Sequence, residues 1–147
     1  MRTRSLGLLF LCSVVAKAQI DRKFDVYDAT IPQLQEALKK KRVTSRRLVE
    51  QYLIRIATFE DKLNATLFVN PKALEKADQL DRERAQGKLR GPLHGIPIAL
   101  KDNIHTTNMP TTGGAMAFAG YTPPYEATIT KHRYSIKDSI SRPLTLT

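Results

Sequence analysis

Hydrophobic residues recur at helical spacing in several segments of this chain, and the first predicted helix begins at Thr30. Pro32 lies in its first turn, and Gln33 has the spacing of a capping box with Thr30. Its apolar positions are Leu34, Ala37 and Leu38. These residues predict a short helix with one buried face.

Two further helices are predicted between residues 44 and 87. The second begins at Thr44, where Val43 and Leu48 have the spacing of a hydrophobic staple. Its apolar stripe has a period of 3.6 residues and consists of Leu48, Val49, Tyr52, Leu53 and Ile56. The third is predicted to begin at Asn70 and Pro71 and to stop at Gly87.

Two short apolar runs lack the helical period and predict strands. One is 66–69, rich in residues that favour strands, and the other is 98–100. The second run is continuous rather than alternating, which is typical of a strand buried on both faces. Glycines and prolines at 87–97 predict a shaped loop before it, and 127–132 predicts the start of a fourth helix. This order predicts an α/β fold, with few strands for a complete sheet.

The first eighteen residues predict a cleaved signal peptide, with Gln19 as the mature N-terminus. Arg2 and Arg4 precede an apolar run at 6–16, and Ala16-Lys17-Ala18 offers small residues for cleavage. We therefore expect a secreted or periplasmic protein. The run is shorter than the ~20 residues of a membrane span, so no stable membrane span is expected; a short anchor or a buried helix is the alternative.

Cys12 is the only cysteine, and it lies inside the predicted signal peptide. The mature chain would therefore have neither a thiol nucleophile nor a cysteine-based metal site. His105 and His132 lack acidic or cysteine partners at metal-ligand spacing, so no metal site and no cofactor are expected.

The 147-residue chain is basic, with 24 Lys and Arg against 14 Asp and Glu. Six cations fall between residues 39 and 47, namely Lys39, Lys40, Lys41, Arg42, Arg46 and Arg47. A small basic protein that binds nucleic acid or an anionic surface is one interpretation. Aromatic residues are not interleaved with the cations, and the predicted export disfavours a nucleic-acid partner, so a solvated helix junction is favoured.

Lys101 follows the apolar run 98–100 directly. Burial there would disfavour the ammonium form and leave a neutral amine able to act as a base. From spacing alone, a lysine that ends a strand and reaches solvent is the favoured alternative. His94 is interpreted as structural rather than as a general base, and Asp102 as capping a turn rather than orienting Lys101.

The segment Gly91–Asn103 reads G-P-L-H-G-I-P-I-A-L-K-D-N and resembles the amidase-signature family, which has a nearly identical run at the end of a core strand. Thr111–Gly114 is similar to the family's T-T-x-G-S segment, with Ala115 in place of the serine. The resemblance covers about 28–133 and leaves 134–147 as a divergent tail, expected to be disordered. It implies the N-terminal part of a fold in which helices pack on a mixed central sheet, incomplete here.

This resemblance implies hydrolysis of amide C–N bonds by a Ser–cis-Ser–Lys triad, with Lys101 as the matching lysine and a small-molecule or peptide amide as substrate. The serines after Lys101 are Ser135, Ser139 and Ser141, and none lies in a glycine-rich stretch. We therefore expect a truncated chain that keeps the base but lacks both serines and the oxyanion loop. A non-catalytic fragment from a disrupted gene or gene prediction is the alternative.

Asn64-Ala65-Thr66 forms an N-glycosylation sequon, which matters only if the protein passes through a eukaryotic secretory pathway.

Because the serines are missing, we expect purified residues 19–147 not to hydrolyse simple amides in a steady-state ammonia-release assay. Turnover by this protein that disappears in Lys101→Ala would contradict the expectation.

Overall fold

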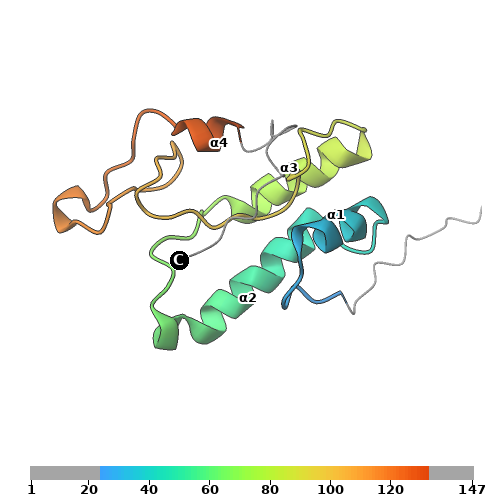
Figure 1. Ribbon diagram of the computed structural model, residues 1–147, viewed down its shortest axis with the longest axis horizontal. Helices are drawn as coiled ribbons and strands as arrows, with labels where there is room; N and C mark the ends of the chain where they lie inside the picture. The colour runs from blue at the N-terminus through green and yellow to red at the C-terminus, as the bar shows by residue number, and fades with distance from the viewer. Residues whose placement is uncertain (1–23, 133–147) are drawn as a thin grey trace, which may run out of the picture.

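The computed structural model describes residues 24–132, and this part of the chain is built from helices and loops (Figure 1). The helices are α1 (Ile31–Lys39), α2 (Ser45–Leu63), α3 (Ala73–Ala85), the 3-10 helix η1 (Met116–Phe118) and α4 (Thr128–His132). No helix in the described part is long and apolar enough to cross a membrane. The predicted signal peptide, Cys12 and the predicted tail at 134–147 lie outside the described residues.

The first two helices begin where the sequence predicts. The Thr30 backbone N–H donates to Gln33 Oε1 at 2.8 Å, and the Thr30 hydroxyl accepts from the Gln33 backbone N–H at 3.5 Å. This is the predicted capping box. At the start of α2, the Thr44 hydroxyl accepts from the Arg47 backbone N–H at 3.1 Å. Both predictions are confirmed.

α2 and α3 run antiparallel and are joined through the first turn of α2 (Figure 1). The Asp81 carboxylate of α3 accepts hydrogen bonds from the backbone N–H groups of Ser45 at 2.8 Å and Arg46 at 3.1 Å. The Arg46 guanidinium also pairs with Asp78 at 2.6 Å. A carboxylate suits the positive end of a helix dipole, so α3 both caps α2 and fixes the angle between the two helices.

α3 begins later than the sequence predicts. Asn70 Oδ1 accepts from the Lys72 backbone N–H at 2.9 Å, and the Asn70 carbonyl accepts from the Ala73 N–H at 3.0 Å. Asn70 therefore closes a turn that holds Pro71, and the helix starts only at Ala73. The predicted stop is confirmed, because the helix ends at Ala85 and Gly87 follows with a φ of 73°.

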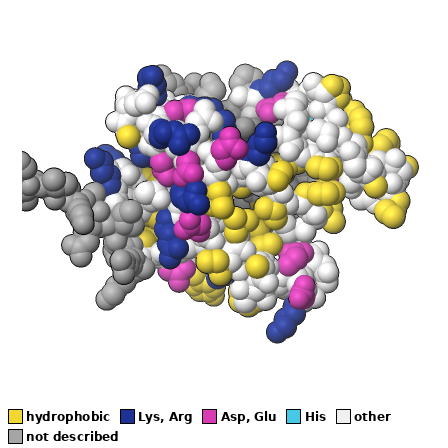
Figure 2. Space-filling model, turned by 180° about the vertical axis from the view of Figure 1, so that it is seen from behind, with side chains coloured by type: hydrophobic (Ala, Val, Ile, Leu, Met, Phe, Trp, Pro, Cys, Tyr) yellow, Lys and Arg dark blue, Asp and Glu magenta, His cyan; other side chains and the backbone are white. Residues whose placement is uncertain are grey.

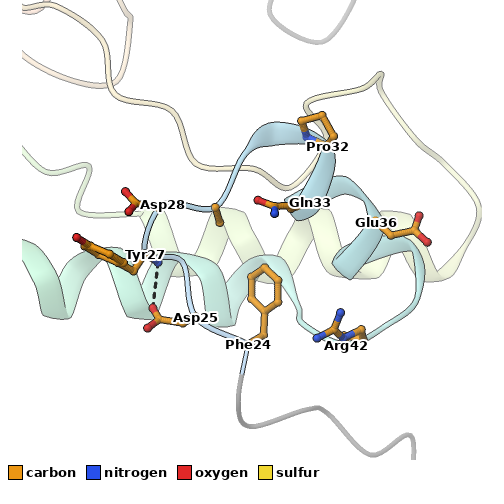
Figure 3. A pocket seen from close by; sticks show the side chains of 9 residues that line it. Phe24, Asp25, Tyr27, Asp28, Pro32, Gln33, Glu36 and Arg42 are labelled. Atoms are coloured by element: carbon orange, nitrogen blue, oxygen red, sulfur yellow. Dashed lines mark hydrogen bonds between the residues drawn. The ribbon is translucent and has the colours of Figure 1, made fainter.

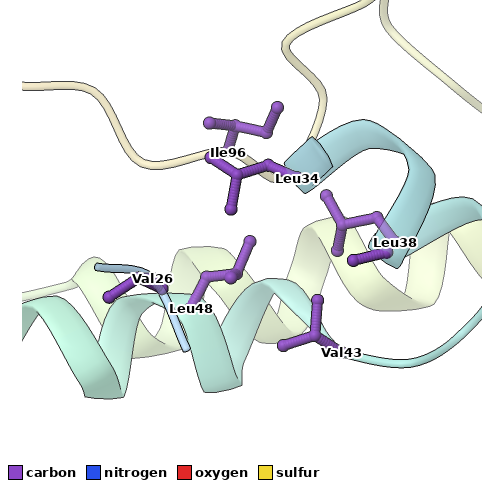
Figure 4. Packing of buried hydrophobic residues seen from close by; sticks show 7 residues of the cluster. Val26, Leu34, Leu38, Val43, Leu48 and Ile96 are labelled. Atoms are coloured by element: carbon purple, nitrogen blue, oxygen red, sulfur yellow. The ribbon is translucent and has the colours of Figure 1, made fainter. Parts of the chain in front are cut away.

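The core lies between α1, the N-terminal half of α2 and one residue of the loop that precedes Lys101 (Figure 4). Its buried members are Val26, Leu34, Ala37, Leu38, Val43, Leu48 and Ile96. The predicted apolar positions of the first helix are all buried, and Val43 and Leu48 pack in the same cluster, as the staple predicts. Ile96 brings the glycine- and proline-rich loop onto this core.

The two strand predictions are wrong for the described residues. Neither 66–69 nor 98–100 forms a strand, and residues 24–132 contain none. The expected burial of 98–100 is also absent, since Ile98 is 45% exposed. A strand requires a neighbour for its N–H and C=O groups, and no other described segment pairs with either run. Strand-favouring composition therefore could not produce a strand here.

Gly95 lies where the loop touches the start of α2. Its φ is +83°, and a Cβ placed there would stand 2.1 Å from Ser45 Oγ. Ser45 itself is buried at 1% exposure. Only a residue without a side chain permits this approach, so Gly95 is a condition for the loop's position.

We expect Gly95→Ala to destabilise the chain by about 2–4 kcal/mol, which combines left-handed backbone strain with overpacking against Ser45. Gly87→Ala is the matched control, because Gly87 has a similar φ of +73° and nothing within 4 Å of its ideal Cβ. The control should lose only about 1–2 kcal/mol. Urea unfolding followed by circular dichroism measures both, and equal losses would show that contact with Ser45 is unimportant.

Candidate functional site

Two segments that carry the sequence motifs are linked through the Asp102 carboxylate. Asp102 Oδ1 accepts from the Thr112 backbone N–H at 3.0 Å, and Oδ2 accepts from the Gly114 N–H at 3.2 Å. The Thr112 hydroxyl donates a further bond to Oδ2, and the Gly113 N–H donates to the Asp102 carbonyl at 3.3 Å. Asp102 therefore closes the turn at 112–114 onto the residue that follows Lys101.

These bonds also affect the charge of Asp102. The Thr112 hydroxyl, with backbone N–H groups of the same turn, holds the pKa of the Asp102 carboxyl below its usual range, against a smaller effect of burial. The interpretation that Asp102 caps a turn is confirmed. The sequence did not indicate which turn, because Asp102 and Thr112 are ten positions apart and neither belongs to a regular element.

Lys101 lies at the surface, next to this turn. Its side chain is exposed, and its carbonyl accepts from the Ile104 N–H at 2.9 Å. Within residues 24–132 the Lys101 ammonium makes no hydrogen bond or ion pair. The expected burial of Lys101 is therefore wrong for this part of the chain, because the strand that was to bury it has no neighbours. Its catalytic role stays a prediction.

His94 holds the loop before Lys101 against α3. Its ring is buried; Nδ1 accepts from the Arg90 backbone N–H at 3.2 Å, and Nε2 lies 2.9 Å from the Leu80 carbonyl. This pattern assigns the proton to Nε2. Arg84 Nη2 donates to the His94 carbonyl at 2.6 Å. Both ring nitrogens are occupied by main-chain partners, so the structural interpretation of His94 is confirmed.

A second link holds the start of the same loop. The Arg90 guanidinium makes two hydrogen bonds to the Glu83 carboxylate, one of them at 2.6 Å from Nε. Arg90 lowers the pKa of Glu83 to about 2. The loop that leads to Lys101 is thus fixed to α3 by one buried ring and one surface ion pair.

Ser45 is the only serine among residues 24–132, and its surroundings do not make it a nucleophile. Its Oγ is buried against Gly95 and has no hydrogen-bond partner there. The nearby imidazole of His94 is committed to Arg90 and Leu80. The serines after Lys101 lie outside the described residues. In the described part of the chain, no group of three acidic, histidine or cysteine side chains is placed to hold a metal.

A shallow hollow of about 470 Å³ lies beside the start of α1, away from the two motif segments (Figure 3). It is lined by Phe24, Asp25, Tyr27, Asp28, Ala29, Pro32, Gln33, Glu36 and Arg42. Its carboxylates stand at an open rim, and neither Lys101 nor the 111–114 turn contributes to it. The hollow offers neither a nucleophile nor a base aimed at an enclosed space.

The basic cluster at 39–47 is partly neutralised. Lys40 pairs with Glu36 at 2.8 Å, and Arg47 pairs with Glu50 at 3.3 Å. The Arg42 guanidinium lies 5.8 Å from the centre of the Phe24 ring. Arg46 is held by acidic residues as well. These contacts fit the favoured interpretation of a solvated helix junction.

We expect Asp102→Asn to speed hydrogen exchange of the Thr112 and Gly114 amides, because it removes the charged acceptor of both. In the unaltered protein, the lowered pKa means that protection is full above the ordinary aspartate value of about 4 and is lost as pH falls through the folded pKa. The variant should lack this pH dependence. Asp61→Asn, an exposed change on α2, is the control in the same NMR experiment, and equal effects of both changes would exclude the Asp102 link.

Comparison with known proteins follows the same residues. The amidase family model matches residues 47–134. A subunit of the glutamyl-tRNA(Gln) amidotransferase of Prochlorococcus marinus (strain NATL2A) is 41% identical over 103 residues, which cover 69% of this chain and 21% of that protein. The native peptide amidase of Stenotrophomonas maltophilia is 38% identical with a TM-score of 0.70, over 74% of this chain and 23% of that chain. An amidase family protein from Bacillus anthracis str. Ames is 33% identical with a TM-score of 0.68, over 73% and 22%.

The chain thus spans about a fifth of the length of the relatives it matches. At these identities the likeness extends to the fold, so the helices of residues 24–132 are one part of an α/β amidase-signature fold. The family model covers more than half of the 147 residues, and the motif at 91–103 with its lysine lies inside it. This chain belongs to the amidase family.

Proposed function

We propose that this chain supplies the basic lysine of an enzyme that hydrolyses amide C–N bonds. The observation that carries the proposal is the Asp102 link, which holds Lys101 beside the 112–114 turn, so that the two motif segments form one surface. The unit concerned is about residues 28–133, which includes nearly all of the family match.

In the proposed reaction, a serine hydroxyl from the rest of an amidase fold attacks the amide carbonyl carbon. Its proton passes through a second serine to the neutral amine of Lys101 and then to the leaving nitrogen as the C–N bond breaks. Water hydrolyses the resulting acyl-enzyme ester and releases the acid. The described residues supply only the lysine and its supporting turn, since Ser45 is buried elsewhere.

The substrate class follows from what the relatives share. One relative is part of a glutamyl-tRNA(Gln) amidotransferase, and another is a peptide amidase. These names have an amide group in common, and differ in the molecule that carries it. We therefore propose an amide substrate, small or peptidic, without assigning the group beyond the carbonyl. No cofactor is required by this chemistry.

A chimera tests the proposal. Residues 28–133 replace the matching segment of the Stenotrophomonas maltophilia peptide amidase, and release of ammonia from a peptide amide is measured. We expect turnover in the chimera and a loss of at least about 10³-fold in Lys101→Met, because the only base for the nucleophile is removed.

Lys88→Met is the matched control, since Lys88 is an exposed lysine in the turn after α3. It should keep the activity of the parent chimera. Circular dichroism and thermal melting establish that each variant is folded. A folded chimera without turnover, or a Lys101→Met chimera as active as Lys88→Met, would contradict the assignment of the base.

A further inference from the structure

Large hydrophobic side chains lie exposed along the C-terminal half of α2 and in the two segments that the sequence predicts as strands. On α2 they are Ile54, Phe59 and Leu63, at 60%, 44% and 68% exposure. In the other segments they are Leu67, Phe68, Val69 and Ile98. We call these residues the uncovered surface. Figure 2 shows hydrophobic side chains gathering across the middle and right of one view, while charged side chains gather mainly on the left.

The length of α2 explains why its second half is exposed. Ser45 at the start of α2 is bonded to Asp81, which lies eight residues after Ala73, the first residue of α3. In an antiparallel pair with equal rise, Ala73 therefore lies opposite about residue 53 of α2. The ten residues from Ile54 to Leu63 extend beyond α3.

This overhang is apolar on more than one side. Ile54 and Leu63 are nine residues apart, which places them about 180° apart around the helix axis at 100° per residue. A helix with apolar residues on opposite sides is typical of one enclosed by other elements rather than one lying on a surface. The uncovered surface therefore requires an occupant that surrounds the overhang.

The two irregular segments indicate what kind of occupant fits. In the described chain, the backbone N–H and C=O groups of 67–69 and 98–100 take part in no protein hydrogen bond. Apolar segments with unpaired backbone groups add as strands to a sheet. An occupant with its own strands would satisfy both segments, whereas the described part of a second copy of this chain offers helices and no strand.

We propose that the uncovered surface binds the remaining part of an amidase fold, which adds strands beside 66–69 and 98–100 and encloses the end of α2. In the Stenotrophomonas maltophilia peptide amidase, the region matching this chain makes up 23% of the polypeptide, so the larger part of that fold lies outside the match. The proposal concerns assembly and holds whether or not Lys101 is the catalytic base.

The test uses the full 147-residue chain, co-expressed with the Stenotrophomonas maltophilia peptide amidase from which the matching region has been deleted. We expect a one-to-one complex by size-exclusion chromatography with light scattering. Leu67→Lys and Leu63→Lys should each weaken the complex at least about tenfold, because a charge would be buried without a partner. Both side chains are more than 60% exposed in the described chain, so its own folding should tolerate them.

Leu89→Lys is the matched control, because Leu89 is a similarly exposed leucine, at 58%, outside the uncovered surface. It should leave the affinity unchanged. Equal weakening by Leu67→Lys and Leu89→Lys, a homodimer in place of the mixed complex, or a folded covalent chimera whose two parts do not associate when separate would each overturn the proposal. A complex that forms but does not hydrolyse amides supports the interface and counts only against the proposed function.

Discussion

The contact between Gly95 and Ser45 brings the motif-bearing loop onto the start of α2, and the course of the chain after residue 97 depends on it. Ser45 is buried at this point and its backbone N–H is held by Asp81 of α3. α2, α3 and the loop therefore meet around one residue. A side chain at position 95 would occupy the space of the Ser45 hydroxyl, so the three parts can meet only because position 95 is glycine.

Polar bonds then fix the loop in this position. A buried histidine and a guanidinium would each be costly without partners, yet here their partners are main-chain groups of α3 and of the loop itself. The His94 ring spans from the Arg90 N–H to the Leu80 carbonyl, and Arg84 reaches the His94 carbonyl. A histidine beside a glycine, which in isolation suggests proton transfer, serves here to hold the loop against α3.

Local signals in the sequence predicted what local interactions determine. The capping box at Thr30, the cap at Thr44 and the stop at Gly87 each involve residues within four positions of one another, and all three were correct. The turn at Asn70 was misjudged, because the same side chain can cap a helix or close a turn before it. The Asp81 cap and the Asp102 link join residues far apart in sequence, so no local pattern indicated them.

The two strand predictions failed for a different reason, which bears on Lys101. Segment 98–100 has the composition of a buried strand, but strand formation depends on hydrogen bonds to a neighbour, and residues 24–132 contain no such neighbour. The same lack leaves Lys101 exposed, and an exposed ammonium remains hydrated and has no lone pair with which to accept a proton. A strand added beside 98–100 would displace water from the residue that follows it. Completion of the sheet and activation of the lysine are thus one physical event, because the element that pairs with the strand is also the element that buries its end.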